Sequence, residues 1–354
     1  MKRLFYWCSL AFLAACAAGC GKEAEAVAET APAPAAAPDF DALVRAGASG
    51  IAQKDAAAAA EAAAKALALR PESAEARLLA GQAACLKKDY EQARAHFAAV
   101  IKEKSLPDAL RAKAYAGRGT VEFVRHDVDA ARISFFQARR LDYKNEAAWY
   151  YLGLVYRDVY RFYEAAEEHF RMFARLSKPD DPRAKKVNYE IVPELRRTLA
   201  GIAAARPGAS SSKPNQAAAL IQEAQALEEK GQLAAATKKY GAAFAADPQS
   251  YAAALGYARL VKRTDKTKEG VRKSMLAYRA AIDQKPAVQK NYLEVARLAR
   301  ENQLWAQAVE IMNRAVAHHP DKRGALDQLI AALQKTGNSK LANAWSEYRK
   351  DLRP

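Results

Sequence analysis

Small and apolar residues recur along most of the chain at helical spacing, in blocks that repeat about every 34 residues. Gly47 and Gly81 are 34 residues apart, as are Gly119 and Gly153. The step from Gly81 to Gly119 is 38 residues, which indicates a short insertion near residues 106–107. A pattern with this period predicts an array of similar helical units, each packed on its neighbours.

Each block predicts a pair of helices. A small residue returns twelve positions after each of the four glycines, at Ala59, Ala93, Ala131 and Ala165. Phe97 and Phe135 each follow one of these alanines by four residues. Glycine and alanine allow two helices to approach closely, and the large side chains fill the space between neighbouring units. Pro71 ends a second helix because proline cannot continue the hydrogen-bond ladder.

One stretch is specific enough to suggest a family. Trp149-x-x-Leu152-Gly153-x-x-Tyr156 resembles the first helix of the tetratricopeptide repeat (TPR), a unit of two antiparallel helices. Two later blocks match whole units, with Leu227, Gly231, Leu233, Ala236, Tyr240, Ala243, Asp247 and Pro248 in one and Tyr292, Ala296, Trp305, Ala308, Ala315 and Pro320 in the other. The resemblance covers about four fifths of the chain and implies an all-α, right-handed, TPR-like solenoid of antiparallel helix pairs.

We expect two arrays of these units. Four units lie in residues 40–179 and four, including a terminal cap, in residues 216–354, with a longer turn around residues 264–270. The predicted domains are a first array with extra helices at 39–205, a linker or hinge at 206–215 and a second array at 216–354. Two interpretations of RPGASSSKPN at 206–215 are open: a hinge between two arrays, or a long loop in one continuous solenoid.

Two local features depart from the simple repeat. His169 stands where an aromatic residue is expected in the fourth unit, and Phe170 follows it. Either the turn before Ala166 gains a residue or the second helix is rotated. Between the arrays, Pro182 predicts a helix start that follows Asp181, and Pro193 breaks or restarts that helix.

The first twenty residues have the layout of an export signal. Lys2 and Arg3 precede an uncharged run of sixteen residues, which is short for a membrane-spanning helix. Leu13-Ala14-Ala15-Cys16 resembles the lipobox of bacterial lipoproteins, which implies removal of residues 1–15 and acylation of Cys16. Cys20, with a signal of residues 1–19, is the alternative lipidation site. An ordinary cleaved signal and an uncleaved anchor are the other interpretations.

The lipoprotein resemblance carries a location with it. Residues 16–38 are predicted to form a lipid anchor and an Ala/Pro tether, because the segment after Cys20 has no aromatic residue and cannot build a core. Neither cysteine is followed by Asp. In enteric-type bacteria this implies sorting to the outer membrane, on the side that faces the periplasm.

The sequence contains no catalytic or metal-binding signature. The P-loop, G-x-S-x-G and H-E-x-x-H motifs are absent, and none of the five histidines has a His or Cys partner at helical ligand spacing. Cys85 is the only cysteine after residue 20. We therefore expect a protein that is not an enzyme and that holds no cofactor.

The positive charge is concentrated in the second array. The chain has a formal net charge of +16, and residues 216–354 contain twenty-three basic and fourteen acidic residues. In TPR arrays the first helices line a concave groove, with groove residues three before, one after and four after the small packing residue, which puts them on one helix face. Around Ala258 and Ala296 these offsets give Leu255, Arg259, Lys262, Leu293, Arg297 and Arg300. The first array has a more apolar stripe with Leu78, Phe123, Tyr150 and Leu154.

These observations predict a membrane-anchored, non-catalytic TPR scaffold that binds a protein partner in the bacterial cell envelope, with an acidic segment of the partner in the basic groove. A binder of anionic glycan or lipid headgroups is the second hypothesis. Nucleic acid would also suit the charge, but the export signal argues against it. The alternative without a binding role is that the Arg and Lys residues of the basic stripe merely solvate exposed helix faces.

Overall fold

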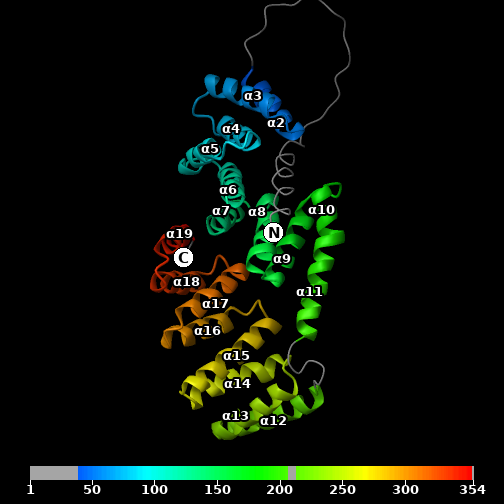
Figure 1. Ribbon diagram of the computed structural model, residues 1–354, viewed down its shortest axis with the longest axis vertical. Helices are drawn as coiled ribbons and strands as arrows, with labels where there is room; N and C mark the ends of the chain where they lie inside the picture. The colour runs from blue at the N-terminus through cyan, green and yellow to red at the C-terminus, as the bar shows by residue number, and fades with distance from the viewer. Residues whose placement is uncertain (1–38, 206–212, 353–354) are drawn as a thin grey trace, which may run out of the picture. The chain divides into compact units, whose positions relative to one another are not determined.

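The structure is a computed structural model that describes residues 39–205 and 213–352, and Figure 1 shows its helices. The described residues form helices and turns and contain no strand. The predicted all-α fold is therefore confirmed. The predictions for the signal peptide, for Cys16 and Cys20, for the tether and for most of the linker fall on residues outside this description. No helix in residues 39–205 or 213–352 has the length and apolar character needed to span a bilayer.

The chain divides into two compact units. The first runs to Val155 and includes Met172–Lys185, and the second comprises Tyr156–Arg171 and the chain from Lys186 onwards. This division lies upstream of residues 206–215, where the sequence suggests a linker. Ion pairs help to explain why residues 156–171 belong to the second unit. Arg314 of that unit pairs with Asp283 at 2.7 Å and with Glu164 at 3.4 Å, which ties residues 156–171 to helices much later in the chain.

The first unit is a series of helix pairs. Its helices are α2 (Phe40–Gln53), α3 (Ala56–Leu69), α4 (Ala74–Leu86), α5 (Tyr90–Lys102), α6 (Asp108–Val124), α7 (Val128–Leu141) and α8 (Glu146–Leu154), and it shares α9 (Tyr163–Leu176) and α10 (Pro182–Lys186) with the second unit. From α2 to α8 each helix packs on the next one along the chain, and the first helices α2, α4, α6 and α8 also contact one another in sequence. The first helices therefore line one surface.

The second unit repeats this arrangement. It contains α11 (Val192–Ala204), α12 (Pro214–Glu229), α13 (Leu233–Ala246), α14 (Tyr251–Thr264), α15 (Lys268–Gln284), α16 (Gln289–Glu301), α17 (Trp305–His318), α18 (Arg323–Lys335) and α19 (Ser339–Lys350). Here too first helices touch, α12 with α14 and α16 with α18. The longer turn expected around 264–270 is wrong: the turn between α14 and α15 comprises residues 265–267 and is as short as the turn between α4 and α5. The extra residues lie in α15 instead, which has 17 residues against 14 in α13. The helices α18 and α19 flank the expected cap turn.

The turns inside the first three helix pairs share one design. In the first three pairs a residue with positive φ, namely Lys54, Lys88 or His126, ends the first helix. An aspartate follows it, and the aspartate side chain accepts a hydrogen bond from the first turn of the second helix, which satisfies an otherwise unpaired amide. The positive-φ positions are 34 and then 38 residues apart, so the backbone follows the period of the sequence.

The fourth pair contains one extra residue. Its positive-φ position is Arg161, 35 residues after His126, and a π-helical turn spans Val155–Tyr160. The backbone amide of Phe162 bonds to the carbonyl of Tyr156, six residues back, whereas the equivalent bond of Asp127 reaches five residues back, to Glu122. The insertion shifts the second helix by one position. This explains why the aromatic of that helix is Phe170 and why His169 precedes it, and it confirms the first of the two predicted alternatives.

A second π-helical turn, Val187–Ile191, joins α10 to α11. Pro193 then lies in the first turn of α11, where its missing N–H costs least. The sequence predicts a break or restart at Pro193; the structure instead keeps helical backbone from 182 to 204, with a change from π-helix to α-helix just before Pro193.

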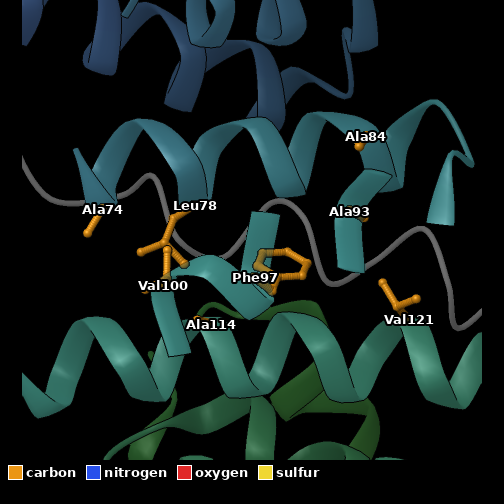
Figure 2. Close-up of a cluster of buried hydrophobic side chains, with 8 residues drawn as sticks. All are labelled: Ala74, Leu78, Ala84, Ala93, Phe97, Val100, Ala114 and Val121. Carbon is orange, nitrogen blue, oxygen red and sulfur yellow. The ribbon is translucent and has the colours of Figure 1, made fainter. Parts of the chain in front are cut away.

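Phe97 is the centre of the core of the first unit. In Figure 2 its ring projects from α5 into the space between α4 and α6, with Leu78, Val100 and Val121 in the same cluster. The ring is 1% exposed. It fits because glycines face it from both neighbouring helices: a Cβ built on Gly81 would lie 2.7 Å from the ring, and one built on Gly117 would lie 2.5 Å from it.

Candidate interaction surfaces

The predicted groove cations of the second unit lie on first helices that are neighbours, but carboxylates alternate with them. Arg259 of α14 pairs with Glu228 of α12 at 2.7 Å. Lys262 of α14 pairs with Glu294 of α16, and Glu294 is also 2.9 Å from Arg297 on its own helix. We call these five residues the charge ladder. It crosses three successive first helices, so the expected stripe exists as a surface with its charge largely compensated.

Arg300 is the exception in this stripe. Arg297 has a second carboxylate, Glu301, at 3.8 Å, whereas no ion pair of Arg300 is found in the described part of the chain. Arg300 is half-buried, and so are Leu255 and Leu293, which keep part of their surface accessible. The basic groove thus offers one uncommitted guanidinium and two aliphatic side chains.

Two tyrosines lie beneath the ladder. Tyr240 of α13 and Tyr278 of α15 are each 4% exposed. Burial raises the pKa of Tyr278 to about 12, and the nearby Glu294 carboxylate acts in the same direction. Burial also raises the pKa of Tyr240, and the Glu228 carboxylate acts in the same direction.

Most of the predicted apolar stripe of the first array is interior. Phe123, Tyr150 and Leu154 are 4%, 8% and 1% exposed. The Phe123 ring meets Tyr151 edge-on at 5.6 Å, and the Tyr150 ring lies 4.9 Å from Phe173. The side chains of these three predicted ligand residues are thus packed into the protein, and only Leu78 borders an open hollow.

This hollow lies on the first-helix surface of the first unit and has a volume of about 130 Å³. It is lined by Val44, Ala48 and Ile51 of α2, by Glu75, Leu78, Leu79 and Gln82 of α4, and by Leu110 and Lys113 of α6. Its floor is aliphatic, while Glu75 and Lys113 are exposed at its edge. Of these lining residues, Leu78 alone is among those predicted from the sequence. The same offsets applied to Gly47 give Val44, Ala48 and Ile51, so the signal was available.

Two observations concern metal binding and thiol reactivity. No group of three or more His, Cys, Asp or Glu side chains that could hold a metal ion occurs within residues 39–205 and 213–352. Burial raises the pKa of the Cys85 thiol to about 12, which disfavours the thiolate needed for nucleophilic chemistry.

Comparisons with known proteins find no matching family model and no matching curated protein. Solved structures do match. The TPR2AB-domain:pHSP90 complex of yeast Sti1 is 14% identical with a TM-score of 0.25, over 88% of this chain and 97% of that chain. Yeast Tom70 is 17% identical with a TM-score of 0.33, over 89% of this chain and 66% of that chain. A tetratricopeptide repeat protein from Parabacteroides merdae is 11% identical with a TM-score of 0.33, over 83% and 98%.

With TM-scores of 0.25 to 0.33, these likenesses carry no argument about the fold or about a partner. The class follows from the chain itself: helix pairs that recur at steps of 34 to 38 residues, a shared turn design in the first three pairs, and glycines that seat an aromatic ring between neighbouring helices. The protein is an all-α protein of TPR-like helix-pair repeats, as the Trp149-x-x-Leu152-Gly153-x-x-Tyr156 pattern predicts.

Proposed function

We propose that this chain is a lipid-anchored, non-catalytic scaffold of the bacterial cell envelope that binds a protein partner through the surface lined by its first helices. The observation that supports the proposal is the contact between successive first helices, which forms a first-helix surface in each compact unit. The hollow lies on this surface in the first unit, and the charge ladder lies on it in the second. The second helices pack behind them and supply structural residues such as Phe97 and Tyr240.

The location rests on the sequence alone. The lipobox-like Leu13-Ala14-Ala15-Cys16 supports anchoring through two or three acyl chains, and a second chain makes membrane attachment firm because one chain gives only marginal binding. Labelling with a palmitate analogue should depend on Cys16, or on Cys20 if cleavage occurs there. A Cys16→Ala, Cys20→Ala double variant that still incorporates label and sediments with membranes would contradict the anchor.

The partner can be tested at single positions. A photocrosslinking amino acid at Gln82 or Arg300, on first helices, should give discrete crosslinked protein products in the cell envelope. The same amino acid at Lys238, an exposed position on the second helix α13, is the matched control. Equal product patterns from Lys238 and the first-helix positions would argue against a first-helix binding surface.

An anionic glycan or lipid headgroup is the alternative ligand. The excess of basic residues in 216–354 and the unpaired Arg300 favour it, whereas the carboxylates of the charge ladder oppose it because they already occupy Arg259, Lys262 and Arg297. Anionic vesicles offer a direct test. Binding that disappears on Arg300→Gln and falls with added salt would favour the headgroup hypothesis.

A further inference from the structure

The hollow of the first unit is flanked by unpaired charges of both signs, whereas most of the predicted groove cations of the second unit are paired. In the second unit, Arg259, Lys262 and Arg297 each have a carboxylate partner. At the hollow, Glu75 accepts a hydrogen bond from the Ser73 hydroxyl at 3.1 Å, and neither Glu75 nor Lys113 forms an ion pair with any described residue. One carboxylate and one ammonium therefore flank an aliphatic floor, and each is free to pair with a ligand.

The size of the hollow limits what fits. Its volume of about 130 Å³ is close to the roughly 150 Å³ of an engineered apolar cavity that admits one benzene ring. One leucine-, methionine- or phenylalanine-sized side chain fills such a space, and a second does not. The floor residues Ile51, Leu78 and Leu79 are at most 6% exposed, so they already belong to a packed wall and need no rearrangement to receive an apolar group.

The two charges lie on different helices. Glu75 is in the first turn of α4, and Lys113 is on α6, the next first helix along the surface. A ligand that inserts one apolar side chain between these helices consequently passes a negative charge on the α4 side and a positive charge on the α6 side. Charge complementarity then requires a basic residue on one side of its apolar anchor and an acidic residue on the other.

From this geometry we propose that the hollow binds a peptide segment of a partner protein, with a single Leu, Met or Phe anchor in the hollow, a Lys or Arg of the segment at Glu75 and an Asp or Glu at Lys113. The proposal rests on the proposed function and specifies the chemistry of the partner. It differs from the acidic ligand expected for the basic stripe, because the hollow selects an ordered pair of opposite charges around one apolar residue.

Selection from a display library of random twelve-residue peptides on the full-length protein tests this. The enriched peptides should share one large apolar residue between a basic and an acidic residue, and the synthetic peptides of the winning sequences then serve as the probes. Ala48→Phe places a ring at the edge of the hollow and should weaken these peptides at least tenfold. Ala46→Phe, on an exposed face of the same helix, is the matched control and should leave the affinity within twofold.

The charge swap Glu75→Lys with Lys113→Glu should leave the fold intact, because both side chains are exposed. It should weaken the original peptides at least tenfold and enrich peptides whose two charges stand in the opposite order. Peptides that bind equally to the wild type, to Ala48→Phe and to the swap variant would overturn the proposal that the hollow is the binding site, and the scaffold function would still stand. Enrichment of purely acidic peptides that depend on Arg300 would also overturn it. Failure of the envelope crosslinks described above would instead count against the scaffold function.

Discussion

Gly117→Ala tests how the helix pairs are held together. In most helices this change is favourable, since alanine exceeds glycine by about 0.8–1.0 kcal/mol in helix propensity. At Gly117 the added Cβ would lie 2.5 Å from Cζ and 2.6 Å from Cε1 of Phe97, against 3.4–4 Å for ordinary contact. The ring must therefore move by nearly an ångström.

The ring has no space for that movement. Gly81 lies against it from α4, and even a Cβ at that position would approach Cε1 within 2.7 Å, so displacement away from α6 drives Phe97 into α4. Overpacking of this kind costs about 1–3 kcal/mol. After subtraction of the propensity gain, we expect a loss of about 0–2 kcal/mol in unfolding free energy, where an open helical site would gain.

Urea denaturation followed by circular dichroism at 222 nm measures the effect. The matched control is Gly201→Ala in α11, where an added Cβ meets nothing within 4 Å; it should stabilise by about 0.4–1 kcal/mol. In a Phe97→Leu background the penalty of Gly117→Ala should shrink, with a coupling energy of about 1 kcal/mol or more. A Gly117→Ala protein as stable as Gly201→Ala, or strict additivity with Phe97→Leu, would refute this account of the repeat.

Two further predictions concern polar groups. Glu294→Gln removes the carboxylate shared by Lys262 and Arg297; because the Glu294 side chain is only 24% exposed, the change should lower the unfolding free energy by about 1–3 kcal/mol. The control Glu269→Gln, at an exposed ion pair, should change the unfolding free energy by no more than about 1 kcal/mol. Urea denaturation of both variants measures the difference. Because partial burial raises the pKa of Cys85 to about 12, its thiol in a body of residues 39–354 should resist a thiol-specific reagent at pH 8 in buffer and react readily in 6 M urea. Rapid labelling of the folded protein would count against the raised pKa.

The helix pairs could be predicted because their determinants are local in sequence. The spacing of Gly81, Ala93 and Phe97 follows directly from which residues a pair can bury, and the structure places all three in the interior. The inserted residue near His169 was visible as a shift in register. Its location in a π-helical turn at Val155–Tyr160 was not, because either a longer loop or a wider helical turn absorbs one residue equally well in a sequence pattern.

The binding surfaces were harder to predict because they depend on pairs of residues from different helices. Offsets from a packing residue identify one face of one helix, and on that basis Arg259 and Lys262 looked uncommitted. Their partners Glu228 and Glu294 lie 31 and 32 residues away, on neighbouring first helices. A repeat of this period makes such partners foreseeable: any carboxylate about one repeat away from a groove cation is a candidate neighbour.

The two surfaces favour different ligands. A ligand that competes for Arg259 or Lys262 must displace a carboxylate that already satisfies the cation, and it leaves that carboxylate behind without its partner. A ligand at the hollow displaces no intramolecular ion pair and covers aliphatic surface. It also forms ion pairs with Glu75 and Lys113, which have no ionic partner in the described residues. Net charge alone points to the second unit as the place of recognition. When intramolecular ion pairs are taken into account, the hollow between α2, α4 and α6 is the surface where a ligand can bind without breaking an existing ion pair.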